Sequence, residues 1–566
     1  MTSSGAAYDV RLLHDQRATL RDGLSLSADV YLPLARGPFP TIVQWTPYES
    51  TRDRFIAWGV FYAERGYAAV VLDVRGRYES DGEFTAYRRD GEDAFDSLDW
   101  VASREWCNGR IGTWGRSYGA IVQWQLAPHR HPAVACMAPH VIMDDYFADC
   151  HYVGGAFQLA LSLGAALIWS TSIGVVTGEN AGRLMLNDRV LRHLPLLELD
   201  EQAIGRRVAC WREWLAHSVD DGFWRSLRHR PEDVTVPVFQ QCGWYDAYPG
   251  ATMRTFQALA GRVPQKVLMG PWSHEEEFTR VIGGHDFGPE ASRVIREDDL
   301  RWYDQWLKEL DTGILDEPPL SLFVMGANRW RHESEWPLPG TELTPWYLHS
   351  GGRANSLAGD GVLSPEPPGA GEPADTYDYD PARPVPTIGG NNSILTMMQN
   401  AVEPIVPGPA DQRPLERRDD VLCYTSAPLE RDLEVTGPVE AVLYAASSAR
   451  DTDFTVRLSD VQPDGRSLVL CEGIVRARHR TGLDRVELLE PGEVAEYRIR
   501  MYPTSNLFRR GHRLRVDVSS SSFPRFSRNL NTGEDIATGT RMEIARQTVL
   551  HTDAYPSHVL LPIVPS

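Results

Sequence analysis

Short apolar runs alternate with amphipathic segments along the first 140 residues of the chain. Thr41–Trp45, Ala68–Asp73, Ile111–Trp114 and Ala133–Ala138 are mainly apolar, which is typical of strands buried on both faces of a sheet. Gly91–Ala102 lies between two of these runs and carries apolar side chains at helical spacing. Alternating strands and helices predict a parallel sheet covered by helices on both faces.

This alternation stops between residues 141 and 235, where helix-like segments follow one another. They are Phe157–Ile168, Arg183–Leu191, Arg206–Ala216 and Gly222–Leu227. The strand pattern resumes at Val236–Gln241 and Lys266–Met269. An insertion after a strand end lies over the carboxyl edge of the sheet, where ligands bind in open α/β folds. We therefore expect residues 141–235 to form a helical cap.

The pattern changes again near residue 316, where short β-prone segments recur with turn residues between them. They include Leu320–Met325, Trp346–Leu348, Val439–Tyr444, Phe454–Leu458, Leu468–Val475, Glu496–Met501, Leu514–Ser519 and Val559–Ile563. Many short strands with little helix predict a β-sandwich or jelly roll. The predicted division is an α/β core over residues 1–140 and 236–315, a cap over 141–235 and a jelly-roll domain over 316–566.

The composition limits the expected partners and cofactors. With 57 Lys and Arg against 77 Asp and Glu, the net charge of −20 argues against nucleic acid or an anionic membrane as a partner. The apolar stretch 156–176 is interrupted by polar residues, which favours a cap helix over a membrane span. Seven cysteines without C-x-x-C spacing indicate neither a zinc site nor a disulfide framework, and no metal or organic cofactor is expected. Reduced thiols and an N-terminus without signal-peptide features predict a cytoplasmic protein.

A G-x-S-x-G motif spans Gly115–Gly119, with Ser117 at its centre. A predicted strand precedes it and a predicted helix follows it, which is the context in which this motif forms a nucleophile elbow. Small residues are needed on both sides of the serine because a Cβ there would collide with the strand or the helix. Ser117 is therefore the candidate nucleophile, and a turn serine before a helix is the alternative.

A serine nucleophile needs a base and an acid, and these follow it on loops after later strands. Asp246 follows the strand predicted at Val236–Gln241, and His274 follows the one predicted at Lys266–Met269. His274 would take the proton of Ser117, and Asp246 would orient the imidazole. The alternatives are a helix cap for Asp246 and a solvated loop histidine for His274.

Two donors are expected for the oxyanion of the tetrahedral intermediate. One is the backbone N–H of Tyr118, because it follows the nucleophile. The other usually comes from the loop after an early strand, and the hydroxyl of Tyr48 is the candidate there. The alternative for Tyr48 is an aromatic side chain in a surface turn.

Longer motifs make the chain resemble the cocaine esterase group. They are Trp45–Tyr48, Asp73–Phe84, Gly115–Gly119, Gly243–Asp246 and Gly270–His274, followed by Asp411–Arg413, Asp420–Tyr424, Asp451–Thr455, Gly511–Arg513, Ser519–Phe526, Asn529 and Asn531–Gly533. That group shares its fold with α-amino-acid ester hydrolases and X-Pro dipeptidyl peptidases. The resemblance implies an α/β-hydrolase core, a helical cap and a C-terminal jelly roll. It also implies that Tyr48, through its hydroxyl, and Tyr118, through its amide, form the oxyanion hole.

The resemblance also suggests a substrate pocket. Trp169 and Tyr248 fall where two aromatic residues of the acyl pocket are expected, and Trp45 belongs to the first motif. His151 stands where that group has a tryptophan, so hydrolysis of benzoyl esters is not implied. Asp144-Asp145 and Asp220-Asp221 are the nearest candidates for a cluster that binds a substrate ammonium, and solvated cap charges are the favoured explanation for them.

We therefore expect a serine hydrolase of the carboxylesterase type, which forms an acyl-enzyme with a small ester or a short peptide-like substrate. The alternatives are an X-Pro dipeptidyl peptidase, an α-amino-acid ester or amide hydrolase, and a non-catalytic binding protein whose jelly roll is the functional module. The oligomeric state is left open, with a homo-oligomer as one alternative.

Overall fold

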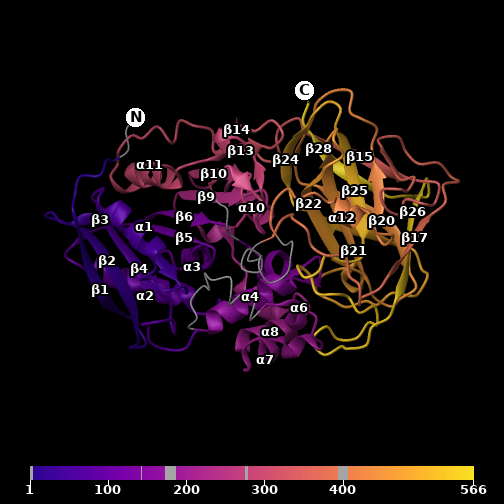
Figure 1. The fold of residues 1–566 in the computed structure, drawn as a ribbon. Helices are drawn as coiled ribbons and strands as arrows, with labels where there is room; N and C mark the ends of the chain where they lie inside the picture. The colour runs from indigo at the N-terminus through magenta and orange to yellow at the C-terminus, as the bar shows by residue number, and fades with distance from the viewer. Residues whose placement is uncertain (1–3, 142, 172–185, 275–277, 393–405, 566) are drawn as a thin grey trace.

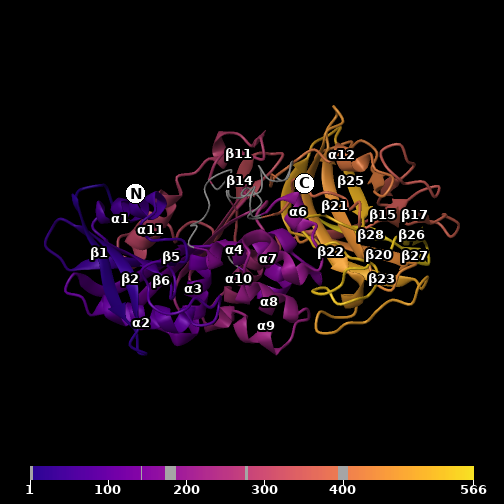
Figure 2. The ribbon, with the colours of Figure 1, turned by 60° about the horizontal axis from the view of Figure 1, so that its bottom comes forward.

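The computed structural model describes residues 4–141, 143–171, 186–274, 278–392 and 406–565 (Figure 1). A group of cap helices is inserted in an N-terminal α/β region, and a C-terminal β domain follows that region. In Figures 1 and 2 the cap helices lie between the N-terminal sheet and the C-terminal β domain. The expected architecture, an α/β-hydrolase core with a helical cap and a C-terminal β domain, is confirmed.

The core is a ten-stranded sheet in the order β1-β2-β4-β3-β5-β6-β9-β10-β13-β14. Its strands are β1 (Val10–Thr19), β2 (Ser25–Pro33), β3 (Phe39–Thr46), β4 (Ala68–Asp73), β5 (Cys107–Arg116), β6 (Val134–His140), β9 (Val238–Gly243), β10 (Gln265–Gly270), β13 (Leu320–Val324) and β14 (Arg329–Glu333). The strands from β4 to β13 run parallel, and β1–β2 is an antiparallel hairpin. The predicted strands of the core are therefore confirmed.

Helices cover both faces of this sheet. They are α1 (Asp53–Ala63), α2 (Asp90–Ala102), α3 (Tyr118–Leu126), α10 (Pro249–Leu259) and α11 (Ile295–Leu307). Successive residues of a strand point to opposite faces of the sheet. Two neighbouring residues of β5 show that each face is covered by a helix. Gly112 lies against Tyr303 of α11, whereas the hydroxyl of Thr113 donates to Gln123 of α3 over 2.7 Å.

The inserted cap contains a π-helix at Tyr146–His151, the short strands β7 (Tyr152–Val153) and β8 (Ala156–Phe157), and several helices. These are α4 (Leu159–Ser170), α6 (Asp188–Leu191), α7 (Leu199–Ile204), α8 (Ala209–Ala216) and α9 (Gly222–Leu227). Most of α4 is buried, as its largely apolar sequence predicts. Part of the helix expected at Arg183–Leu191 lies outside the described residues, and the rest forms α6.

The described residues of the C-terminal domain form a network of fourteen strands. These are β15 (Glu342–His349), β16 (Val362–Ser364), β17 (Asp375–Tyr379), β18 (Leu422–Thr425), β19 (Leu433–Gly437), β20 (Glu440–Ser447), β21 (Asp453–Val461), β22 (Ser467–Arg476), β23 (Ala495–Arg500), β24 (Thr504–Phe508), β25 (Arg513–Ser519), β26 (Ala545–Thr552), β27 (Tyr555–Pro556) and β28 (His558–Ile563). Nearly all of its pairs are antiparallel, as in the predicted β-sandwich.

One predicted boundary is wrong. The segment Leu320–Met325, assigned from the sequence to the jelly roll, contains β13, which pairs in parallel with β10 of the core sheet. The antiparallel strand β14 follows it, so the core sheet extends to Glu333 rather than ending at residue 315. A short apolar run has the same appearance in either kind of sheet, and for this reason its pattern did not reveal which one it joins.

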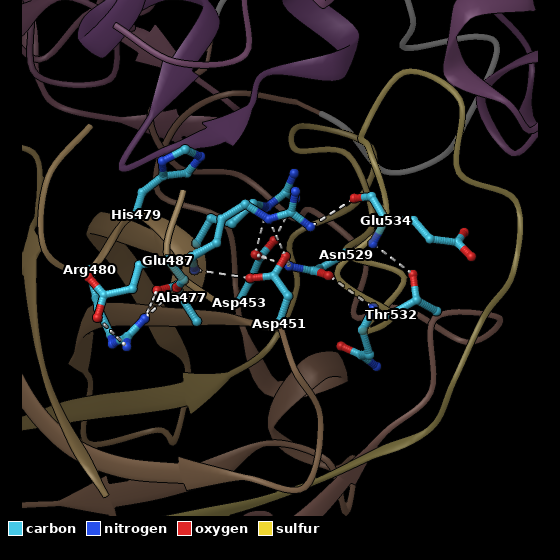
Figure 3. Close-up of polar contacts among 12 residues, drawn as sticks. Asp451, Asp453, Ala477, His479, Arg480, Glu487, Asn529, Thr532 and Glu534 are labelled. Atoms are coloured by element: carbon cyan, nitrogen blue, oxygen red, sulfur yellow. Dashed lines mark hydrogen bonds and ion pairs between the residues drawn. The ribbon is translucent and has the colours of Figure 1, made fainter. Parts of the chain in front are cut away.

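A buried polar network orders the part of the β domain that meets the cap. The amide of Asn529 donates to Asp451 over 2.9 Å and to Asp453 over 2.8 Å (Figure 3). Arg476 binds Asp453 with two hydrogen bonds of 2.9 Å, and its own backbone N–H donates to the carbonyl of Gly154 in the cap over 2.9 Å. The motif residues Asp453 and Asn529 therefore lie in the same network as Arg476, which joins the β domain to the cap.

Candidate active site

Ser117 lies at a sharp turn between β5 and α3. Its backbone has a φ of 54° and a ψ of −117°, a conformation that costs a non-glycine residue about 1–3 kcal/mol. A Cβ on Gly115 would lie 2.4 Å from the backbone of Gly119, and a Cβ on Gly119 would lie 2.9 Å from the carbonyl oxygen of Trp45. Both glycines are therefore required by close backbone contacts. The amide of Ser117 donates to the carbonyl of His140 over 3.1 Å, which fixes the turn against β6.

Asp246 and His274 come from loops that follow the neighbouring strands β9 and β10, and the sheet brings them together. The Nδ1 atom of His274 lies 2.9 Å from Oδ2 of Asp246. The other carboxylate oxygen accepts the backbone N–H of Tyr248 over 3.2 Å. Asp246 is fully buried and His274 is nearly so, which shields their hydrogen bond from water.

The two loops are also joined through their backbones. Tyr245 donates its N–H to the carbonyl of Trp272 over 2.9 Å, and Trp244 donates to the carbonyl of Gly270 over 2.9 Å. The approach at Gly243 is so close that a Cβ there would lie 2.1 Å from the carbonyl oxygen of Trp272. The glycines in the Gly243–Asp246 and Gly270–His274 motifs therefore let the acid and histidine loops pack directly on each other.

The expected oxyanion donors come from two different elements, the start of α3 and the loop after β3. Tyr118 is the first residue of α3, and an amide at a helix start has no intrahelical acceptor. The phenol of Tyr118 is buried and donates to Asp90 over 2.8 Å, so its side chain serves the core. Burial raises the pKa of Asp90 to about 7, and the bond from Tyr118 opposes that rise. Tyr48 is half-buried and stands in the loop after β3, where its N–H donates to the hydroxyl of Thr46 over 3.0 Å.

A cavity of about 310 Å³ brings most of the predicted site residues together. Its described wall includes Trp45, Tyr48, Ser117, Trp169, Tyr248 and His274. The cap contributes Leu161, Ala165, Ile168 and Trp169, which are spaced so that one side of α4 faces the cavity. Ser117 and His274 thus meet in a chamber that the core and the cap enclose jointly.

The prediction for His151 is wrong. Among the described residues this histidine is not part of the cavity wall, and its side chain is completely buried. Its Nδ1 lies 2.9 Å from the hydroxyl of Ser162, and its ring centroid lies 4.2 Å from that of Trp214. Burial lowers the pKa of His151 to about 3, so the ring is neutral at physiological pH. It fills an aromatic cluster behind Trp169 instead of contacting a ligand.

Several wall residues were missed by the sequence analysis. Arg54 and Trp58 come from α1, Trp114 from β5, and Arg296 from the start of α11. Trp114 could have been found, because it lies at the carboxyl end of a predicted strand, three residues before Ser117. The contributions of α1 and α11 depend on helix packing, and no local motif marks them.

The described residues contain no group of three or more His, Cys, Asp and Glu side chains that could hold a metal ion. No helix of the described ranges is both long and apolar enough to cross a bilayer.

Comparisons with known proteins agree with this geometry. Residues 22–276 match the X-Pro dipeptidyl-peptidase (S15) family, and residues 312–560 match the X-Pro dipeptidyl-peptidase C-terminal non-catalytic domain. The chain is 38% identical to the cocaine esterase of Rhodococcus sp. strain MB1 Bresler, over 96% of this chain and 97% of that protein. It belongs to the cocaine esterase and X-Pro dipeptidyl-peptidase family of serine hydrolases. The serine hydrolase family that the sequence motifs indicated is thereby confirmed.

Two solved structures of this family's fold resemble the whole chain. An α-amino acid ester hydrolase superposes with a TM-score of 0.85 at 25% identity, covering 100% of this chain and 98% of that structure. An aminopeptidase from the marine sediment archaeon Thaumarchaeota archaeon gives a TM-score of 0.85 at 26% identity, covering 99% and 97%. The arrangement of core, cap and β domain is therefore shared by proteins that are named for different activities.

Proposed function

We propose that this serine hydrolase is a carboxylesterase with Ser117 as nucleophile, His274 as general base and Asp246 as the residue that orients the histidine. The observation that supports this most is the position of Ser117 and His274 in one cavity wall, with Asp246 holding Nδ1 of that histidine over 2.9 Å. This hydrogen bond leaves Nε2 as the nitrogen that can exchange a proton with the serine.

The proposed reaction has two halves. Ser117 Oγ attacks the ester carbonyl while His274 takes its proton, and the backbone N–H of Tyr118 and the hydroxyl of Tyr48 donate to the oxyanion. The tetrahedral intermediate collapses, the alkoxide leaves with the proton from His274, and an acyl-enzyme remains. Water then enters, gives its proton to His274 and attacks the acyl carbon. The acid is released as Ser117 regains its proton.

The described cavity wall favours an ester without a free α-amine. Aromatic rings dominate it, and its charged side chains are Arg54, Arg116 and Arg296. The described part of this wall therefore offers no carboxylate that could bind a substrate ammonium. The glutamates at positions 275–277, which follow His274, lie outside the described residues.

A second candidate function is the hydrolysis of an α-amino-acid ester or of an X-Pro dipeptidyl amide. The match to the S15 family and the TM-score of 0.85 to an α-amino acid ester hydrolase support it. A non-catalytic binding role has less support, because the β domain packs on the cap and core of a family of hydrolases.

The test compares wild-type enzyme with Ser117→Ala on p-nitrophenyl acetate, on an alanine ester and on a Gly-Pro anilide. We expect the wild type to prefer the simple ester and Ser117→Ala to be inactive on all three. Wild-type activity in Ser117→Ala would overturn the assignment of the nucleophile. A rate on the Gly-Pro anilide close to the ester rate would establish the second candidate function instead.

We also propose that the protein works in the cytoplasm. No disulfide joins its seven cysteines, and six of them are buried. Whether copies of the chain associate into a homo-oligomer is decided by light scattering on the purified protein. Fractionation of the source cells with an antibody tests the location.

A further inference from the structure

Arg77 connects the two sides of the cavity through its guanidinium group. It lies in the loop between β4 and α2, within the Asp73–Phe84 motif, and it is 7% exposed. That loop folds back tightly, because a Cβ on Gly76 would lie 2.2 Å from the backbone nitrogen of Phe84, and Gly76 has a φ of 68°. The fold of the loop therefore drives the Arg77 side chain inward, between the core and the cap.

On one side, the guanidinium of Arg77 contacts the loop that carries Tyr48, the proposed oxyanion donor. The Nε atom of Arg77 donates to the carbonyl oxygen of Pro47 over 3.0 Å, and Pro47 is the residue before Tyr48. The position of the Tyr48 hydroxyl depends on this loop backbone. A donor displaced by about 1 Å can reduce the rate by about 100-fold, since catalysis depends on its placement before the reaction.

On the other side, the guanidinium of Arg77 contacts the carboxyl end of the cap helix α4. Arg77 donates to the carbonyl oxygens of Trp169, of Ile168 over 3.3 Å and of Thr171 over 3.1 Å. The last carbonyls of a helix have no intrahelical donor and carry the negative end of its dipole. The buried guanidinium donates to these carbonyls, and its positive charge balances the negative end of the dipole. It does so at the helix turn that carries Trp169 of the cavity wall.

The chemistry of this contact requires arginine. A guanidinium presents five N–H donors in a rigid plane, whereas a lysine has three donors at a single point. The acceptors that Arg77 contacts belong to two separate segments, so a single ammonium would not hold both in place. The guanidinium also lies 5.8 Å from the ring of Phe84, whose centroid is 6.2 Å from that of Trp169, and this packing limits its movement.

We propose that Arg77 is a positioning residue, which holds the Tyr48 loop and the Trp169 end of α4 in a fixed arrangement around the acyl group. This inference rests on the proposed function, because it takes Tyr48 as an oxyanion donor and Trp169 as a pocket residue. Arg77 does not line the described cavity wall, so it acts through these two residues.

The test is a double-mutant cycle with Arg77→Lys and Tyr48→Phe, measured as kcat and KM on p-nitrophenyl acetate. Rates are expressed per active site, counted by labelling with a fluorophosphonate. We expect Arg77→Lys to lower kcat by about 100-fold with a smaller change in KM. In the Tyr48→Phe background the same change should lower kcat only slightly, because the donor that Arg77 positions is already absent.

Two arginines serve as matched controls. Arg75 is 8% exposed in the same loop, but it binds Asp93 and Asp22 on the side of the core. Arg206 donates to the carbonyl of Ser170 at the end of α4, but no hydrogen bond of the described residues joins it to the Tyr48 loop. Arg75→Lys and Arg206→Gln should therefore lower thermal stability without the loss of kcat that depends on Tyr48.

Additive effects of Arg77→Lys and Tyr48→Phe would overturn the proposal, and so would an equal loss of kcat in either control. Arg77→Gln is the second variant, and failure of both Arg77 variants to fold would also count against a positioning role. If Ser117→Ala kept its activity, the proposed function would fail first. If Ser117→Ala is inactive and the cycle is additive, only the inference about Arg77 fails.

Discussion

Both carboxylate oxygens of Asp246 are engaged, and one of them lies 2.9 Å from Nδ1 of His274. The two residues are brought together by the parallel pairing of β9 and β10, which places their carboxyl ends at the same edge of the sheet. The acid and histidine loops are also hydrogen-bonded to each other through their backbones. The orientation of the imidazole is therefore determined by the core sheet, and it does not depend on the cap.

Asp246→Asn tests this relationship. The amide can stabilise the wrong tautomer of His274 and cannot balance the imidazolium, so kcat should fall by about 10⁴-fold while the protein stays folded. Steady-state kinetics on an aryl ester together with thermal unfolding provide the measurement. A loss of less than tenfold would show that Asp246 does not orient the histidine.

Gly243→Ala should destabilise the acid loop. Its new Cβ would lie 2.1 Å from the carbonyl oxygen of Trp272, so the backbone must shift, at an expected free energy of about 1–3 kcal/mol. Urea unfolding and kcat measure the two consequences. Gly222→Ala is the control, because nothing lies within 4 Å of its Cβ position. Equal stability of the two variants would contradict the steric explanation.

Trp169→Ala should change the acyl preference. Trp169 lines the cavity, so its truncation makes room for bulkier acyl groups, and the ratio of kcat/KM for benzoyl over acetyl esters should rise at least tenfold. His151→Ala is the control, since that ring is buried in the neighbouring cluster and does not line the described wall. It should lower the melting temperature and leave the ratio unchanged. A change of the ratio in His151→Ala would restore His151 to the pocket.

Asp73 makes stability depend on pH. Burial raises the pKa of Asp73 from its ordinary value of 3.8 to about 8, and hydrogen bonds from Ser50 only partly oppose this. Between these two values the folded protein holds a proton that the unfolded chain releases, so the contribution of this group to stability is lost as the pH rises through about 8. The wild type should therefore lose stability relative to Asp73→Asn between pH 5 and pH 9.

Melting temperatures measured by calorimetry from pH 5 to pH 9 test the direction of this pH dependence. Asp286→Asn is the control, because the hydrogen bond from Arg280 lowers the pKa of Asp286 from 3.8 to about 2, so its contribution to stability is lost only as the pH falls from about 3.8 to about 2. The difference between the wild type and this control should stay constant from pH 5 to pH 9. A constant difference for Asp73→Asn as well would show that Asp73 is ionised throughout.

The sequence was most informative where a single element determines the structure. The strand that contains Ile111–Trp114, the turn at Ser117 and helix α9 over Gly222–Leu227 follow from local patterns, since apolar runs, glycines and helical spacing are visible along the chain. The strand β24 was missed, because its buried residues Thr504, Ser505 and Asn506 are polar and give no apolar alternation.

At the candidate site, what could be predicted from the sequence was limited for a different physical reason. Trp169 and Tyr248 lie in the described cavity wall, whereas His151, on the cap like Trp169, lies one layer deeper. That difference depends on how α4, α8 and the π-helix pack against each other, and side-chain type alone does not determine the depth of a residue. Arg54 and Arg296 were missed for the same reason, because they come to the cavity on two helices that are far apart in the sequence.

The attachment of β13 to β10 affects how the chain can be divided for expression. The C-terminal family match begins at residue 312, but β13 and β14 complete the sheet that carries the histidine loop. A fragment that stops at that point would leave the backbone groups of β10 along a bare sheet edge, which invites pairing with other chains. A catalytic fragment that stays monomeric would therefore have to include Glu333.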